Sequence, residues 1–288
     1  MAEIIDGRLV AKKTREELKE RVEKLRTEKG VIPGLAVILV GNDPASTVYV
    51  RNKHRGCLEV GIESIEIKLP EDTSEGELLK KIAELNERSD VHGILVQLPL
   101  PKHINEERVI LSISREKDVD AFNPHNVGRI MTGGYDFLPC TPAGVMRLLD
   151  YYGIEIEGKS CVVIGRSNIV GKPMAMLLLE RNGTVTVCHS RTKNLSQYTK
   201  NADIIVVAVG RAGFLRGENV KSGAVVIDVG INRLPSGALA GDVDFDSVSE
   251  VASYITPVPG GVGPMTITTL LENTVKAAEL SLSDTAKK

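Results

Sequence analysis

Aromatic residues are scarce in this sequence, and tryptophan is absent. Aromatic side chains make up 3% of the 288 residues. Proteins that bind single-stranded nucleic acids use such side chains as stacking platforms, and this chain offers few of them. The formal net charge of -2 gives no basic excess that would attract a phosphate backbone. The composition therefore excludes nucleic acid as the expected partner.

Long apolar runs and paired cysteines are also missing. No stretch approaches about 18 uninterrupted apolar residues, the length of a membrane-spanning helix. The first residues, MAEIIDGRLV, lack the basic and apolar segments of a secretion signal. The four cysteines form no C-x-x-C pair, so buried reduced thiols are expected: Cys57, Cys140, Cys161 and Cys188. We expect a cytoplasmic protein with no membrane partner and no bound metal.

The first half of the chain alternates helix and strand patterns. An amphipathic helix over 8–29 precedes a buried strand over 34–41, and Gly61 ends a helix that starts near Ser46. Strand SIEIKLP, a helix with a Ser74–Glu77 capping box and strand 91–97 follow. Strands separated by helices imply parallel, right-handed crossovers.

The second half repeats this pattern after a Gly- and Pro-punctuated connection over 99–142. Apolar strands are expected near 160–165, 184–188, 203–209 and 224–229. A final helix over about 266–280 has no strand after it and is expected to pack back on the first domain. The fold class is therefore α/β with two domains, one comprising residues 1–140 and 268–288 and the other, Rossmann-like, residues 141–267.

Residues 160–173, SCVVIGRSNIVGKP, are typical of a phosphate-binding strand-turn-helix. Gly165 opens a tight turn, Gly171 allows close backbone approach, and Pro173 presets a helical φ, so the free N–H groups of the new helix would face an anion. A Walker loop does not fit, because Pro173 replaces the hydroxyl residue that would hold magnesium. The dinucleotide fingerprint fits only in part, because Ser167 stands at its second glycine.

The next strand favours NADP over NAD. An NAD site usually has an acidic residue at the end of this strand for the ribose 2′-hydroxyl, whereas this chain has Cys188-His189-Ser190-Arg191. With Arg166 in the preceding loop, these residues would suit a 2′-phosphate. A strand-turn-helix that binds nothing remains the alternative.

Polar residues gather where the first-domain strands end. Tyr49 and Lys53 are four residues apart on one helix face, and Gln97 ends strand 91–97. Asp118 and Asp120 lie in the loop beyond and could point to one side if the loop is extended. A phenol, an ammonium, an amide and a carboxylate would then line one cleft. Alternatively, Lys53 is a solvated helix lysine and Gln97 an incidental amide.

The segment PVPGGVGPMT at 257–266 stands immediately before the last helix. Its glycines would let backbone N–H groups approach a ligand, and Thr266 is placed to cap the helix. A purely structural hinge is the alternative.

Taken together, five motifs in order resemble one enzyme family. They are STVYVRNK at 46–53, VQLPLP at 96–101, KDVDAF at 117–122, GRSNIVGKP at 165–173 and PGGVGPMT at 259–266. The chain resembles, from about residue 4 to 280, the bifunctional methylenetetrahydrofolate dehydrogenase/methenyltetrahydrofolate cyclohydrolase family of the bacterial FolD type. The resemblance implies NADP-dependent oxidation of 5,10-methylenetetrahydrofolate, then hydrolysis of the methenyl product to 10-formyltetrahydrofolate in one shared cleft.

The resemblance also implies residue roles. Lys53 matches the lysine of the hydrolytic step, Gln97 the amide bonded to it, and Tyr49 the tyrosine that stacks on the folate rings. Asp120 matches the carboxylate that holds the pterin, and Gly261 and Pro264 fall on the folate-side loop. The positions that match cofactor contacts are Gly165, Arg166, Ser167, Gly171, Ser190, Arg191 and Ile231.

One residue departs from the family pattern, and two other functions stay open. Ala121 stands where glycine is expected, and its Cβ narrows the allowed φ beside Asp120. A shikimate-type NADP dehydrogenase would also combine two α/β domains with a lysine and an aspartate, and a non-catalytic nucleotide-binding module is the third possibility. A homodimer is the family expectation.

Overall fold

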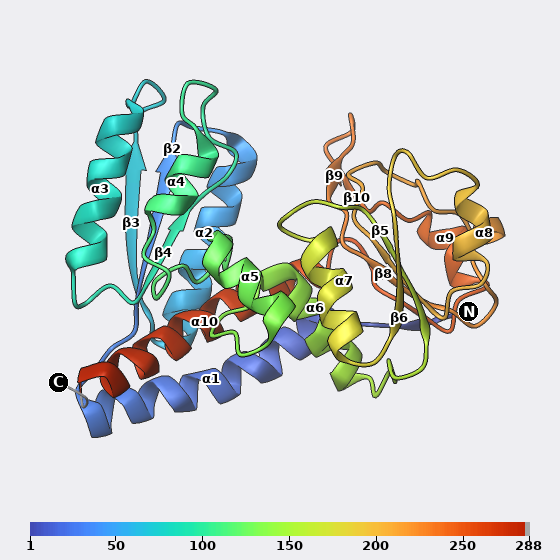
Figure 1. Ribbon diagram of the computed structural model, residues 1–288, viewed down its shortest axis with the longest axis horizontal. Helices are drawn as coiled ribbons and strands as arrows, with labels where there is room; N and C mark the ends of the chain where they lie inside the picture. Colours follow the sequence, from blue (N-terminus) through green and yellow to red (C-terminus); the bar gives the residue numbers. More distant parts are fainter. Residues whose placement is uncertain (286–288) are drawn as a thin grey trace. The chain divides into compact units, whose positions relative to one another are not determined.

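The computed structural model describes residues 1–285, which form two compact units (Figure 1). The lysine unit comprises Lys13–Cys140 and Ile267–Lys288, and the Rossmann unit comprises Met1–Lys12 and Thr141–Thr266. Two α/β domains were expected, and the structure confirms this fold class. The division differs from the expected one at the N-terminus, since residues 1–12 group with the Rossmann unit. Residues 286–288 of the expected first domain lie outside the described residues.

The lysine unit is built on a three-stranded parallel sheet of order β3-β2-β4. The helix expected over 8–29 and the capping box of α3 are both observed. The elements of this unit, some of which extend beyond it, are α1 (Gly7–Lys29), β2 (Gly34–Val40), α2 (Pro44–Val60), β3 (Glu63–Leu69), α3 (Glu75–Glu87), β4 (Gly93–Val96), α4 (Glu106–Ser112), α5 (Pro124–Thr132) and α10 (Val262–Thr285).

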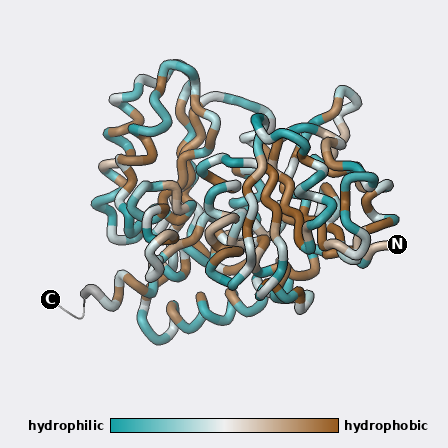
Figure 2. The backbone as a smooth tube through the Cα atoms, turned by 45° about the vertical axis from the view of Figure 1, so that its right-hand side comes forward, coloured by the Kyte–Doolittle hydropathy of each residue, from teal (hydrophilic) through white to brown (hydrophobic). Residues whose placement is uncertain are grey.

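The central strand β2 explains how this unit holds together. All seven of its residues are buried, and they alternate between the two faces of the sheet. Ala36 and Ile38 pack with residues of α3 and α4, whereas Leu35 and Val37 pack with residues of α1, α2 and α10. Burying one such large side chain stabilises the fold by roughly 1.5–3 kcal/mol. Figure 2 colours the chain by hydropathy and shows hydrophobic and hydrophilic segments alternating along it.

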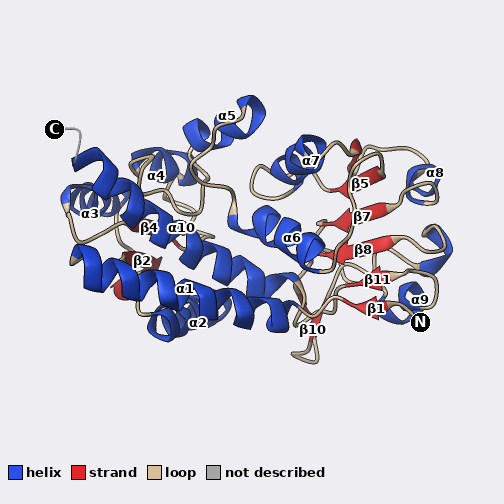
Figure 3. Cartoon of the chain, turned by 90° about the horizontal axis from the view of Figure 1, so that it is seen from below, coloured by secondary structure: helices blue, strands red, loops and turns tan. Residues whose placement is uncertain are grey.

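The Rossmann unit contains a six-stranded parallel sheet of order β1-β11-β8-β7-β5-β6. Figure 3 shows α6 and α7 on one face of this sheet and α8 and α9 on the other. The elements are β1 (Glu3–Ile4), α6 (Cys140–Tyr151), β5 (Ser160–Ile164), α7 (Gly171–Glu180), β6 (Thr184–Cys188), α8 (Leu195–Thr199), β7 (Ile204–Val207), a 3-10 turn (Gly217–Asn219), β8 (Val225–Asp228), β9 (Asn232–Arg233), β10 (Leu239–Ala240), α9 (Phe245–Ser249) and β11 (Tyr254–Ile255).

Four strands of this sheet were expected, and two were missed. The missed strands β1 and β11 have two residues each, which is too short for a hydrophobic period to be visible in the sequence. β1 pairs in parallel with β11, Glu3 opposite Tyr254. This pairing is the physical reason why the first residues belong to the Rossmann unit.

The last helix begins earlier than the sequence suggested. α10 starts at Val262, so the segment expected to be a loop through 266 already contains its first turn. Pro264 is compatible with that turn, because the N–H it lacks would have no partner within the helix. The expected cap at Thr266 is therefore wrong, because Thr266 lies inside α10. The Thr266 hydroxyl instead forms a hydrogen bond with the hydroxyl of Thr141 at 3.1 Å. The expected packing of the C-terminal helix on the first domain is confirmed by Leu270 and Leu271, which lie in the same core cluster as β2.

Within residues 1–285, none of the helices combines the length and the apolar character needed to cross a membrane. The four cysteines are all buried and carry free thiols, as expected.

Candidate active site

Lys53 and Gln97 meet at the carboxyl edge of the three-stranded sheet. β2 and β4 run in parallel with Ile38 opposite Val96. The helix that follows β2 and the residue that follows β4 therefore lie at the same edge, where ligands of such sheets bind. Lys53 lies on α2 and Gln97 directly follows β4, as the strand pattern predicted.

The Lys53 side chain is buried, with an exposed fraction of 8%. Its Nζ donates a hydrogen bond to Gln97 Oε1 at 3.0 Å. Gln97 Nε2 in turn donates to the Leu98 carbonyl at 2.7 Å, which fixes the amide with its oxygen toward the lysine. The alternative of a solvated lysine beside an incidental amide is therefore wrong. Tyr49 lies one turn earlier on α2 and is 36% exposed, so part of its side chain remains open to a ligand.

The surroundings of Lys53 tune its proton affinity. Burial lowers the pKa of the ammonium below its usual value, because the charged form loses its hydration. The negative charge of Asp120 opposes this effect. A lysine of lowered pKa gives up its proton more readily than a solvated one and can serve as an acid or a base.

Asp118 and Asp120 have different environments, and the loop does not have the extended form in which both could point to one side. The Asp118 carboxylate accepts the backbone N–H groups of Phe122 at 3.2 Å and Asn123 at 2.8 Å, and the side-chain amide of Asn126 at 2.8 Å. These bonds fold the loop back on itself, and Asp118 is 2% exposed. Asp118 is thus a structural residue that shapes the loop, whereas Asp120 is only partly buried.

Ala121 has a left-handed backbone, with φ of +57°, and is fully buried. This conformation costs a non-glycine residue roughly 1–2 kcal/mol. The loop holds it there, since the Ala121 N–H donates to the Asp118 carbonyl at 3.0 Å. The departure from the expected glycine is therefore accommodated by the same φ that glycine would favour.

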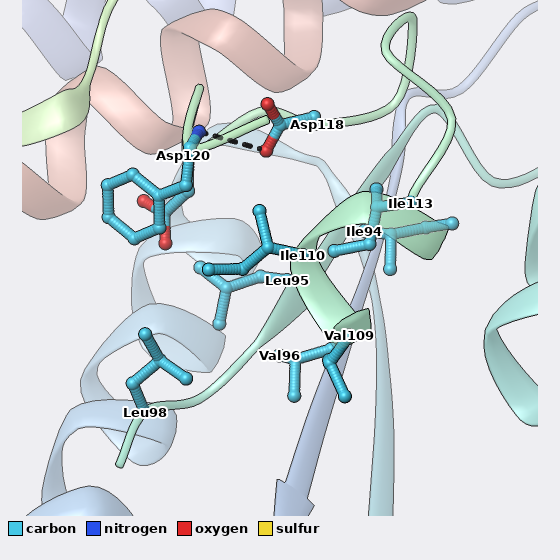
Figure 4. Close-up of a pocket in the computed structure, with 10 residues that line it drawn as sticks. Ile94, Leu95, Val96, Leu98, Val109, Ile110, Ile113, Asp118 and Asp120 are labelled. Carbon is cyan, nitrogen blue, oxygen red and sulfur yellow. Dashed lines mark hydrogen bonds between the residues drawn. The ribbon is translucent and has the colours of Figure 1, made fainter. Parts of the chain in front are cut away.

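A small pocket lies beside these two carboxylates (Figure 4). Its walls come from β4, α4 and the loop that carries Asp118 and Asp120, and most of them are apolar. The lining residues are Ile94, Leu95, Val96, Leu98, Val109, Ile110, Ile113, Asp118, Asp120 and Phe122. Its apolar walls belong largely to the core cluster that contains Ile94 and Val109, so the pocket is an indentation of that core beside the two carboxylates.

Two residues that support Asp120 were missed by the sequence reasoning. Asn273 of α10 donates from Nδ2 to the Val119 carbonyl at 2.8 Å and to the Leu138 carbonyl at 3.0 Å. The Cys140 thiol donates to the same Val119 carbonyl at 3.4 Å. Burial, with the negative charge of Asp120, raises the pKa of Cys140 well above its ordinary value, so it stays a neutral thiol. The sequence near Asn273 carries no signal of this contact, which joins residues 154 positions apart.

In the Rossmann unit, the β5–α7 turn has the close packing that its glycines predicted. A Cβ on Gly171 would lie 2.3 Å from the Gly165 carbonyl oxygen, so only glycine fits there. The N–H groups at the helix start were expected to be free, but they already have acceptors within the turn. Ser167 Oγ accepts the N–H groups of Val170 at 3.2 Å and Gly171 at 3.3 Å, and the next N–H donates to the Ser167 carbonyl. The sequence could not show that Ser167 Oγ would accept these two N–H groups.

The end of β6 lies against the start of this turn. The Gly165 N–H donates to the Cys188 carbonyl at 2.9 Å. Beyond Cys188, the Arg191 N–H donates to His189 Nδ1 at 3.1 Å, which forms a tight turn with Arg191 exposed. Arg166 and Ser190 are exposed as well, and no carboxylate lies between residues 188 and 191. This donor set fits the 2′-phosphate of NADP better than the free 2′-hydroxyl of NAD.

Ile231, Gly261 and Pro264 also belong to the Rossmann unit. Ile231 follows β8, is 45% exposed, and its Cδ1 would lie 3.8 Å from a Cβ on Gly263. Ile231 therefore lies beside the first turn of α10. That turn contains Pro264 and directly follows Gly261. Tyr49, Lys53, Gln97 and Asp120 belong to the lysine unit.

These features define an α/β enzyme that uses a nucleotide cofactor. One unit has a parallel sheet with a glycine turn and cationic loop residues, and the other has a buried lysine. The chain belongs to the tetrahydrofolate dehydrogenase/cyclohydrolase family. The catalytic domain of this family matches residues 5–120, and its NAD(P)-binding domain matches residues 139–282.

Individual relatives agree with this assignment over nearly the whole chain. A bifunctional FolD protein from Acetivibrio thermocellus is 62% identical over 97% of this chain and 98% of its own. The crystal structure of the bifunctional FolD enzyme from Campylobacter jejuni has a TM-score of 0.95 at 54% identity, covering 98% of this chain and 100% of its own. The FolD enzyme of Trypanosoma brucei, solved with NADP and an inhibitor, has a TM-score of 0.94 at 42% identity, covering 98% of each chain.

The alternative of a shikimate-type dehydrogenase agrees less well with the comparisons. A shikimate 5-dehydrogenase from Thermus thermophilus, covering 86% of this chain and 99% of its own, has a TM-score of 0.52 at 15% identity. That likeness concerns the fold alone.

Proposed function

We propose that this chain oxidises 5,10-methylenetetrahydrofolate with NADP and then hydrolyses 5,10-methenyltetrahydrofolate to 10-formyltetrahydrofolate. The observation that carries the proposal is the buried Lys53, bonded to Gln97 and within the field of Asp120, in a chain of this family. A buried amine of lowered pKa suits hydrolysis, and a nucleotide-binding unit suits oxidation.

The Rossmann unit supplies the cofactor site. Arg166, Ser190 and Arg191 would hold the 2′-phosphate, since all three are exposed and no acidic residue accompanies them. Ser167 Oγ already accepts two N–H groups of the helix start, so its own hydrogen can point toward an anion and pass on the polarity of the helix. Gly165, Gly171 and Ile231 would shape the remaining contacts. When bound, NADP accepts a hydride from the one-carbon unit of the substrate.

The lysine unit manages protons in the hydrolytic step. Water addition to the methenyl carbon releases one proton, and cleavage of a carbon–nitrogen bond then requires a proton on the departing nitrogen. Lys53 in its neutral form would take the first proton and deliver it to the departing nitrogen. The added hydroxyl loses its proton to solvent as the formyl C=O forms, so that one proton is released overall. Gln97 holds the amine in place at 3.0 Å.

Binding of the folate falls to other residues. The Asp120 carboxylate would accept paired N–H donors from the pterin ring, which are charge-assisted hydrogen bonds. Tyr49 would stack on the ring system with its exposed face. Gly261 and Pro264 would contact the folate from the start of α10.

The test is to mix the purified protein with NADP and 5,10-methylenetetrahydrofolate and follow the absorbance of reduced cofactor. Consumption of 5,10-methenyltetrahydrofolate is followed in a separate assay without NADP. Shikimate serves as the comparison substrate. Turnover of shikimate, or cofactor binding with no turnover of either folate, would refute the proposal and favour one of the two alternatives.

We further propose that the protein is a cytoplasmic homodimer. Four buried free thiols suit a reducing compartment. Two-fold symmetry is the commonest form of oligomer, and β6 forms an edge of the six-stranded sheet at which a second copy could pair. Light scattering should give twice the chain mass of 31.1 kDa. A mass of one chain at micromolar concentration would contradict the dimer.

A further inference from the structure

Two carboxylates are buried together at the carboxyl edge of the six-stranded sheet. Asp228 ends β8 and is 3% exposed, and Asp242 follows β10 and is fully buried. Burying a carboxylate is costly unless hydrogen bonds replace its hydration.

The Asp242 carboxylate is saturated with neutral donors. Its Oδ2 accepts the backbone N–H groups of Val209 at 2.6 Å and Gly210 at 2.9 Å. Its Oδ1 accepts the Arg211 N–H at 2.8 Å and the Asn232 amide at 2.9 Å. One side chain therefore fixes the backbone of the loop after β7 and the residue that follows Ile231.

The Asp228 carboxylate binds the Asp242 N–H and the backbone directly after it. Its Oδ1 accepts the N–H of Asp242 and that of Gly230, both at 2.9 Å, and its Oδ2 accepts the Val243 N–H at 2.9 Å. The fit is close, because a Cβ on Gly230 would lie 2.2 Å from Asp242 Cγ, and a Cβ on Gly241 would lie 1.8 Å from Asp228 Oδ2. Asp228 thus holds the backbone that carries Asp242, and Asp242 in turn holds the backbone of the loop after β7.

The pair has no cationic partner among the described residues. The Arg211 guanidinium lies over the Phe214 ring, 5.4 Å from its centre, and Arg233 donates to the Gly237 carbonyl. The Asp244 carboxylate caps α9 by accepting the Ser247 N–H. The charged groups on the neighbouring elements are therefore engaged elsewhere, and the two carboxylates rely on N–H dipoles.

The loops fixed by this pair lie at the edge of the sheet that is expected to bind the cofactor. A Cβ on Gly165 would meet the Ala208 carbonyl oxygen at 2.3 Å, so the loop after β7 begins against the β5–α7 turn. Ile231 stands between Gly230, which bonds Asp228, and Asn232, which bonds Asp242. In open parallel sheets the dinucleotide lies across the carboxyl ends of such strands.

We propose that Asp228 and Asp242 are positioning residues for the cofactor, which together hold residues 209–211 and 230–232 in the shape that binds NADP. This inference rests on the proposed function, because it assumes an NADP site at this edge. The two residues touch neither cofactor nor substrate, and they act through the backbone they hold.

The test uses the full chain with Asp242→Asn and Asp228→Asn, and Asp244→Asn as the control. Asparagine presents an N–H₂ group to backbone donors at the first two positions, whereas at Asp244 it is an equally good helix cap. Isothermal titration calorimetry should show the Kd for NADP raised by about 10-fold or more in both test variants and by less than about twofold in the control. Amide hydrogen exchange should rise at 209–211 in Asp242→Asn.

Hydrolysis of 5,10-methenyltetrahydrofolate by the same samples separates positioning from general unfolding, because Lys53, Gln97 and Asp120 belong to the lysine unit. Its rate should stay within about threefold of wild type. If Asp242→Asn does not fold, Asn232→Ala decides, since it removes one of four donors and leaves both carboxylates. An NADP Kd within about twofold of wild type in the folded test variants, or in Asn232→Ala, would overturn the inference. A wild-type protein that does not bind NADP would instead refute the proposed function.

Discussion

Each unit buries a charged side chain whose hydrogen-bond partners are neutral, but the two side chains have different roles. Lys53 in the lysine unit has a single hydrogen-bond acceptor among residues 1–285, the Gln97 amide oxygen. Asp242 in the Rossmann unit accepts four hydrogen bonds. A buried group with unused hydrogen-bonding capacity is free to exchange a proton, whereas a saturated one fixes the structure around it. The number of partners, more than burial itself, separates the reactive residue from the structural one.

The largest expected effect comes from removing the reactive charge. Lys53→Met should lower the hydrolytic rate by about 10²–10⁴-fold, the usual worth of general acid-base catalysis. Hydride transfer needs mainly alignment of the two ligands, so the dehydrogenase rate should fall less. Both rates are measured on one preparation, with circular dichroism as the check on folding. Lys68→Met, on a side chain that is 68% exposed, is the control. Equal loss of both rates would leave Lys53 a substrate-positioning residue.

Asp120→Asn should weaken folate binding and lower both activities together. Charge-assisted hydrogen bonds contribute about 1.5–3 kcal/mol each, so the KM for both folates should rise roughly 10- to 150-fold. Asp72→Asn, an exposed carboxylate of the same unit, is the matched control. Loss of one activity alone, with unchanged folate affinity, would speak against a binding role.

Arg191→Ala and Arg166→Ala should reduce the preference for NADP over NAD. A lost contact to the 2′-phosphate is expected to cost about 1.5–3 kcal/mol, which lowers the NADP/NAD ratio of kcat/KM by roughly 10- to 150-fold. Steady-state kinetics with both cofactors measures this ratio, and Arg181→Ala, whose guanidinium pairs with Asp150 at 2.8 Å, serves as the control. An unchanged ratio in both test variants contradicts the assignment.

Asp228, the second buried carboxylate of the Rossmann unit, should make the stability of the protein depend on pH. Burial raises the pKa of Asp228 from 3.8 to about 6. A raised carboxyl pKa means that the folded state binds more protons than the unfolded state between these values, so stability falls as pH rises through this window and is level above it. Between pH 5 and 7.5 the wild type should lose about 1.4 kcal/mol relative to Asp228→Asn. Urea unfolding at the two pH values measures the difference, and parallel curves would show that Asp228 does not titrate there.

The smallest effect is expected at Ala121. Replacing it by glycine relieves a left-handed alanine, worth roughly 1–2 kcal/mol, but removes a buried methyl group worth about 0.8 kcal/mol and adds unfolded-state entropy worth about 0.4–1 kcal/mol. These contributions nearly cancel, so the free energy of unfolding and the folate KM should both stay close to wild type. A large fall in KM in Ala121→Gly would show that this alanine displaces Asp120.

The sequence predicted the helices and strands that show a hydrophobic period or a helix-capping motif. The α/β alternation, the Ser74 capping box and the Lys53–Gln97 contact could all be inferred, because each depends on neighbours in sequence or on the common edge of parallel strands. The contacts that span the chain could not. Asn273 bonds Val119 across 154 positions, and nothing near either residue indicates the other. Likewise, Ser167 competes for the donors of its own helix, which only the local geometry reveals.

The pairing of Glu3 with Tyr254 has a consequence for how the protein is made. On the ribosome, β1 is among the first segments to emerge, while β11, its neighbour in the sheet, follows roughly 250 residues later. The core around β2 waits in the same way for Leu270 and Leu271 of α10. Contacts of such long sequence separation pay a loop-closure entropy before they stabilise anything, which slows folding. Neither unit can therefore complete its core before nearly all of the chain has been synthesised, so both are expected to finish folding together, late in translation.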